Sequence, residues 1–163
     1  MAAVPTERAA PDGARSWRDQ DEPRVLLIDP DQVTRAALVA ALVHAGAEVV
    51  AALRTGMTAV YAVRQHGPTV IVIDLDLRPA GAWGGLTLVA SLAKEAPTVP
   101  ILAAVRPELQ ELSARAHRAG ARRLLSKLDV DAVVAAVHDE HAAARSGRLP
   151  ARGADAGDAR RPG

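Results

Sequence analysis

The sequence contains no cysteine and no phenylalanine, and aromatic residues make up only 2% of its 163 residues. Without cysteine, the chain has no disulfide, no thiolate metal ligand and no cysteine nucleophile. This composition fits a reducing compartment, so we expect a cytoplasmic protein. Because phenylalanine is absent, the core must be aliphatic, and a hydrophobic content of 49% is enough to build one.

An excess of charge of one sign is also missing, since 20 basic residues face 19 acidic ones for a net charge of +1. This balance gives no global basic field for nucleic acid, and the arginines near the C-terminus alternate with aspartates and lack interleaved aromatic residues. No apolar run reaches the roughly 18 residues that a membrane span needs, and the first residues lack the apolar stretch of a signal peptide. We therefore predict no direct contact with nucleic acid or membrane.

The composition divides the chain into three parts. Residues 1–22 and 144–163 mix alanine, proline, glycine and charges of both signs without a periodic apolar pattern. Such segments bury too little apolar surface to offset their ordering entropy, so we expect two disordered tails. Residues 23–143 are long enough for one domain with its own core.

Within residues 23–143, short apolar runs alternate with segments of helical periodicity. Strict alternation of strands and helices predicts a parallel sheet that is covered on both faces. Right-handed crossovers then favour a flavodoxin-like (βα)5 three-layer sandwich with the sheet order 2-1-3-4-5. The expected strands are 25–29, 48–53, 69–74, 100–105 and 124–127, and the expected helices are 31–45, 57–65, 86–96, 107–119 and 129–143.

Three charged residues stand at the carboxyl ends of these strands. Asp29 and Asp74 end the first and third strands, and Lys127 ends the fifth. Open α/β sheets bind ligands outside the carboxyl ends of their strands, at the point where the strand order reverses. We therefore expect these three side chains to share one pocket. The alternative for Asp74 is a carboxylate that only caps the turn after its strand.

Three segments in this order resemble a bacterial response-regulator receiver domain of two-component signalling: 25–29, 68–77 and 119–127. The resemblance covers residues 23–143 and neither tail. It implies a non-enzymatic module whose Asp74 is the phosphoacceptor, supplied by a sensor histidine kinase or a phosphotransfer protein. It also implies that Lys127 contacts the phosphoryl group and that Mg²⁺ neutralises the crowded charge.

The sequence departs from this family at the metal site. The family usually ends its first strand with two adjacent acidic residues, whereas here Asp29 is followed by Pro30. The ligands that the resemblance leaves are Asp29, Asp74 and the backbone carbonyl of Asp76, so we expect weak Mg²⁺ binding. Asp31 either caps the following helix or reaches the metal through water.

Two further departures concern the response to phosphorylation. Val105 stands where the family has Thr or Ser, and Leu124 where it often has Tyr or Phe. Without that hydroxyl and that ring, phosphorylation should couple weakly to the surface. We also expect residues 75–85 to form a glycine-rich loop longer than is usual, in which Trp83 either docks a partner or covers the fold.

These features leave two main hypotheses open. The first is a stand-alone receiver domain in a phosphorelay that acts through contacts with a downstream protein target, with homodimer formation left open. The second is a pseudo-receiver, a protein-interaction module that does not respond to phosphate, which Pro30, Val105 and Leu124 favour. A third hypothesis is a flavin or nucleotide binder. It is weak, because this sequence has no glycine-rich phosphate-binding loop after the first strand. The five histidines are expected at the surface.

Overall fold

The fold of the chain comes from a computed structural model that describes residues 21–77 and 81–148, with the backbone alone at 81–83. Five parallel strands form one sheet in the order β2-β1-β3-β4-β5. The predicted flavodoxin-like topology is therefore confirmed. The strands are β1 (Arg24–Ile28), β2 (Glu48–Leu53), β3 (Val70–Asp74), β4 (Ile101–Val105) and β5 (Arg123–Ser126). The helices are α1 (Gln32–His44), α2 (Ala59–His66), α3 (Gly81–Glu95), the 3₁₀ helix η2 (Pro107–Leu112), α4 (Ser113–Ala119) and α5 (Val130–Arg145).

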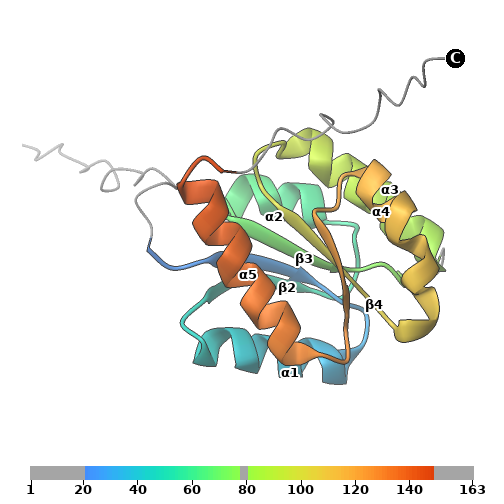
Figure 1. The fold of residues 1–163 in the computed structure, drawn as a ribbon, viewed down its shortest axis with the longest axis horizontal. Coiled ribbons are helices and arrows are strands. Elements are labelled where there is room, and N and C mark those ends of the chain that lie inside the picture. Colours follow the sequence, from blue (N-terminus) through green and yellow to red (C-terminus); the bar gives the residue numbers. More distant parts are fainter. Residues whose placement is uncertain (1–20, 78–80, 149–163) are drawn as a thin grey trace, which may run out of the picture.

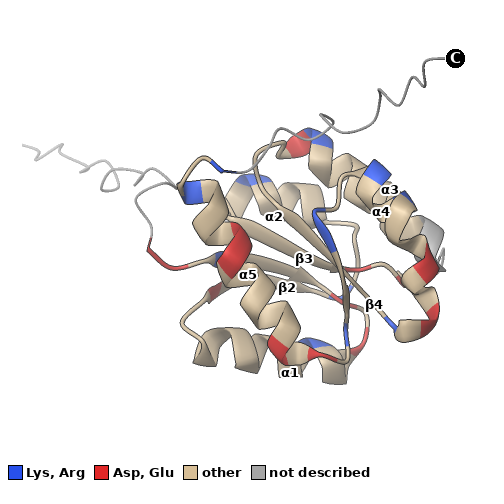
Figure 2. Ribbon diagram, in the orientation of Figure 1, with Lys and Arg blue, Asp and Glu red and all other residues tan. Residues whose placement is uncertain are grey.

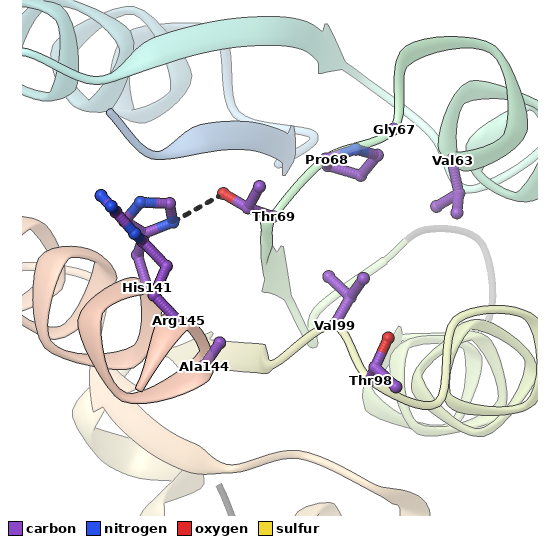
Figure 3. A pocket seen from close by; sticks show the side chains of 9 residues that line it. All are labelled: Val63, Gly67, Pro68, Thr69, Thr98, Val99, His141, Ala144 and Arg145. Carbon is purple, nitrogen blue, oxygen red and sulfur yellow. Dashed lines mark hydrogen bonds between the residues drawn. The ribbon is translucent and has the colours of Figure 1, made fainter. Parts of the chain in front are cut away.

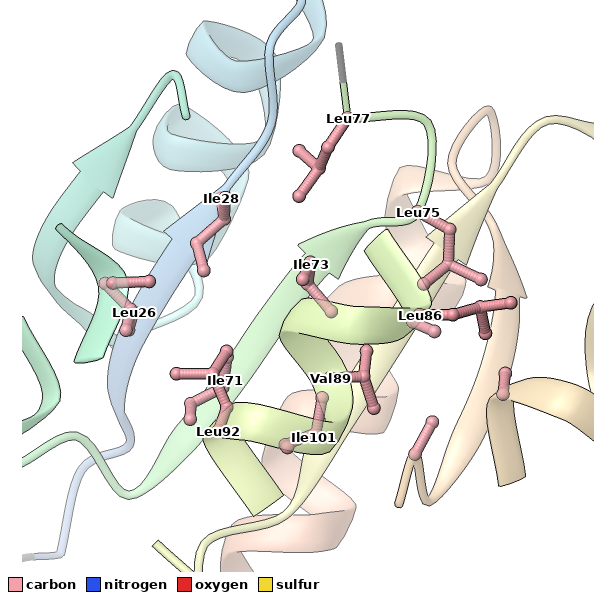
Figure 4. Close-up of a cluster of buried hydrophobic side chains, with 14 of the residues drawn as sticks. Leu26, Ile28, Ile71, Ile73, Leu75, Leu77, Leu86, Val89, Leu92 and Ile101 are labelled. Carbon is pink, nitrogen blue, oxygen red and sulfur yellow. The ribbon is translucent and has the colours of Figure 1, made fainter. Parts of the chain in front are cut away.

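The helices cover the two faces of the sheet and make three layers. Helices α1 and α5 lie on one face, and α2, α3 and α4 lie on the other (Figure 1). Side chains alternate along each strand, so Leu26 and Ile28 face one cluster of apolar residues while Val25 and Leu27 face the other. Figure 4 shows the first of these clusters between the sheet and α3. All residues of β3 and β4 are buried, which explains their continuous apolar sequences.

The segment after β3 differs from the prediction. Helix α3 begins at Gly81, so the expected loop over residues 75–85 ends earlier than its glycines suggested. Gly85 lies inside the helix, and a Cβ there would come within 2.2 Å of the carbonyl oxygen of Leu75. The role of this glycine is therefore to let α3 pack closely against the backbone of Leu75, and not to make a loop flexible. The side chain of Trp83 lies outside the described residues, so its expected role stays a prediction.

The segment after β4 also differs, because residues 107–119 form two short helices instead of one. Leu109 and Leu112 are half-buried while their neighbours in η2 are exposed. A spacing of three residues stacks side chains on one side of a 3₁₀ helix, so this geometry brings both leucines toward the core. The α-helical hydrogen bonds begin only with α4.

The last helix corrects two expectations. Helix α5 runs to Arg145, two residues beyond the expected end, and Arg145 pairs with Asp21 at 2.9 Å. His141 is buried, not at the surface, and its Nδ1 lies 3.0 Å from the hydroxyl of Thr69. The expected disordered tails fall almost wholly outside the described residues and stay predictions. Within residues 21–77 and 81–148, the helices are too short or too polar to cross a membrane.

Candidate functional site

The strand order brings Asp29, Asp74 and Lys127 together at the carboxyl edge of the sheet. Lys127 Nζ lies 2.5 Å from Asp74 Oδ2 and 3.6 Å from Asp29 Oδ2. Figure 2 shows acidic and basic segments side by side at this edge, where β3 ends. The predicted proximity is thus observed, and it joins residues that are 53 positions apart in the sequence.

The two carboxylates are oriented by the backbone. The N–H of Asp31 donates to Asp29 Oδ1 at 2.8 Å, and the N–H of Asp76 donates to Asp74 Oδ1 at 2.9 Å. Each aspartate thus accepts a hydrogen bond from the residue two positions on, the arrangement of an Asx turn. The other oxygen of each carboxylate is left to face Lys127.

Burial sets the electrostatics of this cluster. The exposed fractions are 1% for Asp29, 1% for Asp74 and 7% for Lys127. Burial raises the pKa of the Asp29 carboxyl, although the Asp31 N–H and the charge of Lys127 oppose the shift. Burial lowers the pKa of Lys127, but the hydrogen bond and charge of Asp74, together with the charge of Asp29, outweigh it and raise that pKa overall. The lysine therefore stays protonated, and its ammonium group lies beside two buried carboxyl groups.

One ammonium group beside two carboxyl groups leaves room for a second cation. Asp29 Oδ2 is buried and has no hydrogen-bond partner. A buried carboxylate oxygen in this state suits a hard divalent cation such as Mg²⁺. The fit is limited, since the described residues contain no group of three or more His, Cys, Asp or Glu side chains that could hold a metal ion. Asp29 and Asp74 thus supply two carboxylates for a weakened site.

The other candidate ligands have different tasks. Asp31 is the N-cap of α1, and its Oδ1 accepts the N–H of Thr34 at 2.7 Å. The carboxylate of Asp76 pairs with Arg106 at 2.7 Å, so only its backbone carbonyl stays a candidate ligand. Of the two alternatives for Asp31, the structure favours the helix cap.

The positions expected to weaken the response lie close to this cluster. Val105 is fully buried at the end of β4, and its carbonyl accepts the N–H of Lys127 at 2.8 Å. Leu124 is half-buried in β5 and packs against the apolar cluster on the side of α3. Neither side chain offers a polar group. Pro30 follows Asp29 and supplies no ligand oxygen from its side chain.

A model of the response regulator receiver domain family matches residues 25–138 of the chain. The chain belongs to this family. Receiver domains are signalling modules of two-component systems that interact with histidine kinases or phosphotransfer proteins, and they generally bind Mg²⁺ at the phosphorylation site. The match covers the five strands, apart from the first residue of β1, and includes Asp29, Asp74 and Lys127.

Solved structures show the same fold. The chain resembles the receiver domain of Francisella response regulator 1452, with 20% identity and a TM-score of 0.65 over 74% of this chain and 98% of that chain. It also resembles the signal receiver domain of NarL from Mycobacterium tuberculosis, with 22% identity and a TM-score of 0.67 over 76% and 98% of the two chains. A CheY-like receiver domain protein from Methanospirillum hungatei JF-1 aligns at 16% identity and a TM-score of 0.68, over 77% and 98%. No curated protein matches the chain by sequence.

Sequence reasoning missed the ion pair between Asp76 and Arg106 in this receiver domain. Arg106 follows β4 directly, and its Nη2 lies 2.7 Å from Asp76 Oδ2 at the same edge as Asp74. The sequence pattern treats Arg106 as an ordinary loop residue. Its position one residue past a buried strand of a parallel sheet is the signal that could have drawn attention to it.

A cavity of about 160 Å³ lies at the opposite edge of the sheet, before the start of β3. Figure 3 shows Thr69 and His141 on one side of it and Val63 and Val99 on the other. Its lining contains no carboxylate. It therefore has no part in the acidic cluster around Asp74.

Proposed function

We propose that this receiver domain accepts a phosphoryl group on Asp74 from a sensor histidine kinase or a phosphotransfer protein. The observation that carries the proposal is the buried carboxylate of Asp74 with Lys127 Nζ at 2.5 Å and Asp29 beside them. An oxygen of Asp74 attacks the phosphorus of a phosphohistidine. The P–N bond breaks, and the histidine ring of the donor keeps the electron pair.

The neighbours of Asp74 prepare it for this transfer. The N–H of Asp76 fixes one oxygen of the carboxylate, and Lys127 supplies a positive charge for the incoming phosphoryl oxygens. Asp29, Asp74 and the carbonyl of Asp76 would hold Mg²⁺, which neutralises negative charge on the phosphoryl group when it is bound. The chain itself contributes the acceptor, the lysine and the exclusion of water from a buried edge.

The output of the domain is proposed to be contact with a downstream protein in the cytoplasm, not an enzymatic reaction of its own. The response to phosphate should be modest, because Val105 has no hydroxyl to bond a phosphoryl oxygen and Leu124 cannot move a polar tip between core and surface. A ligand shifts an equilibrium only by its different interaction with the two states. We therefore expect phosphorylation of Asp74 to change the affinity for that protein, or for a second copy of the chain, less than about tenfold.

A phosphorylation-independent interaction module is the second candidate. It is favoured by Pro30, which removes a metal ligand, and by the apolar side chain of Val105. Incubation with acetyl phosphate and Mg²⁺ separates the two candidates. Our proposal requires an acyl phosphate on Asp74, whereas the second candidate requires none.

We predict that Pro30→Asp tightens Mg²⁺ binding by at least about tenfold, because Mg²⁺ favours added carboxylate ligands. Pro30 is half-buried beside Asp29, so a new carboxylate there lies next to the cation site. Isothermal titration calorimetry with MgCl₂ measures the change. Gln32→Asp, a matched variant in the first turn of α1, should bind as weakly as the natural protein. Equal affinity in the natural protein and Pro30→Asp would contradict the proposed site.

Two exposed apolar side chains flank the site and offer a surface to the phosphodonor protein. Val33 in the first turn of α1 is 78% exposed, and Leu128, next to Lys127, is 70% exposed. Burial of exposed apolar side chains against a partner protein stabilises a complex, so these two residues would strengthen binding of the donor. A donor histidine must approach this edge to reach Asp74.

We predict that Leu128→Ser lowers phosphotransfer from a sensor kinase by about fivefold or more and leaves phosphorylation by acetyl phosphate unchanged. The kinase is the one that phosphorylates the natural protein fastest in a panel. Val43→Ser at the far end of α1, also an exposed apolar residue, is the control and should change neither rate. Equal loss with both donors would mean that Leu128 affects the site itself and not docking.

A further inference from the structure

Arg106 is placed where it could sense the phosphoryl group. It stands between β4 and η2, and its ion pair with Asp76 joins the loop after β4 to the loop after β3. The N–H of Asp76 in turn donates to Asp74 Oδ1. The guanidinium of Arg106 is therefore held by the residue that orients the acceptor carboxylate.

The hold on Arg106 is weak. Its side chain is 53% exposed and that of Asp76 is 24% exposed. Ion pairs that face solvent contribute little, so a stronger anion nearby can replace the carboxylate. The ion pair uses one terminal nitrogen of Arg106, and a guanidinium carries five N–H donors in all.

A phosphoryl group on Asp74 is such an anion. It adds about 1.5 to 2 negative charges and three strong acceptor oxygens. The guanidinium of an arginine can donate two parallel hydrogen bonds to these oxygens. The carboxylate of Asp76, on a partly exposed loop, binds Arg106 less strongly than such a phosphoryl group would. The buried lysine of the site supplies one cation, and Val105 supplies no hydroxyl donor. This leaves a phosphoryl oxygen without the donor that a hydroxyl would supply, and Arg106 is the residue next to Val105.

We propose that Arg106 leaves Asp76 when Asp74 is phosphorylated and binds the phosphoryl oxygens instead. The inference rests on the proposed function, since it requires an acyl phosphate on Asp74. The exchange moves no proton and breaks no covalent bond. Arg106 is the residue before η2, so its movement carries the signal to that helix without a shift of β4. Helix η2 is held to the core only by partly buried residues such as Leu109, because none of its residues is fully buried.

The exchange predicts opposite effects of the two partners. Arg106→Ala removes a phosphoryl contact, so it should raise the half-saturating concentration of acetyl phosphate by about tenfold, the scale of one charge-assisted hydrogen bond. Arg106→Lys should show a smaller increase, because lysine keeps the positive charge but cannot donate two parallel hydrogen bonds as a guanidinium does. Asp76→Asn releases Arg106 and keeps the backbone of residue 76, so it should lower that concentration.

The experiment follows phosphorylation of the full chain by intact mass at saturating Mg²⁺ over a range of acetyl phosphate concentrations. Arg64→Ala is the matched control, since Arg64 also forms a 2.7 Å ion pair, with Glu95, and is 64% exposed. It should behave as the natural protein. Amide exchange over residues 107–112 should change on phosphorylation of the natural protein and not of Arg106→Ala.

Each outcome decides between distinct accounts. Opposite shifts for Arg106→Ala and Asp76→Asn support the exchange. Shifts in the same direction would mean that the ion pair only holds the two loops together. No shift in either variant would mean that Arg106 does not contact the phosphoryl group. Either result overturns the inference and leaves the proposed function standing. Absence of phosphorylation in the natural protein overturns the proposed function, and the inference with it.

Discussion

Lys127→Ala is expected to lower the free energy of unfolding by about 3 kcal/mol at pH 7, the usual scale for removing one partner of a buried ion pair. Lys127 Nζ lies between the two buried carboxylates, and the variant would leave both without their cation. Urea unfolding followed by circular dichroism measures the loss. Arg64→Ala, which breaks an exposed ion pair, should cause a much smaller loss.

The loss should shrink as the pH falls from 7 through the folded-state pKa of Asp29 in the variant. The folded-state pKa of Asp29 is already raised by burial, so the folded protein binds a proton at a higher pH than the unfolded chain does. Stability from such a group is present below its unfolded pKa and is lost as the pH rises through the folded pKa. Without Lys127 the pKa of Asp29 rises further, so acid should stabilise the variant relative to the natural protein.

Lys127 itself adds no pH dependence in this range. Its folded-state pKa is raised above the ordinary value of 10.5, so its contribution is complete at pH 7 and is lost only at higher pH. A loss of stability in Lys127→Ala that stays constant or grows over the whole acid range in which the natural protein stays folded would contradict the assigned electrostatics. Lys127→Met, which keeps an unbranched side chain that lacks only the terminal ammonium group in length, separates the loss of charge from the loss of packing.

Asp74→Ala is expected to abolish acyl phosphorylation by acetyl phosphate, a loss limited only by the detection of the assay. Asp74 ends the central strand β3, and its Oδ2 lies 2.5 Å from Lys127 Nζ. No other described carboxylate combines these two features. Asp76 lies two residues on, and its carboxylate pairs with Arg106 instead. Intact mass spectrometry before and after incubation measures the change.

Two controls accompany this variant. Asp76→Ala keeps the backbone carbonyl and the N–H that orients Asp74, so it should still be phosphorylated. Asp31→Ala removes a helix cap outside the buried cluster and should also be phosphorylated. Phosphorylation of Asp74→Ala at the rate of the natural protein would show that another residue is the acceptor.

The sheet and the three charged residues could be predicted because their signals are local. A run such as residues 69–74 is apolar throughout because β3 is covered on both faces, and its first carboxylate marks the exit from the core. Strict alternation with helices then leaves few topologies. Once the strand order is known, Asp29, Asp74 and Lys127 must meet at one edge.

Other features depend on contacts that a single sequence does not display. Gly85 could not be distinguished from a loop glycine, because the residue that a side chain there would meet, Leu75, is not its neighbour in the sequence. His141 is buried because α5 places it against Thr69, 72 residues away. The pair of Asp76 and Arg106 joins two loops that only the sheet brings together. In each case, the deciding neighbour is not adjacent in the sequence.

The most direct test of the account is intact mass spectrometry of the natural protein after incubation with acetyl phosphate and Mg²⁺, followed by peptide mapping. The account predicts one phosphoryl group per chain, labile to hydroxylamine as an acyl phosphate is, on the peptide that contains Asp74. A phosphoryl group on another residue, or none under conditions that phosphorylate a known receiver domain, would contradict it.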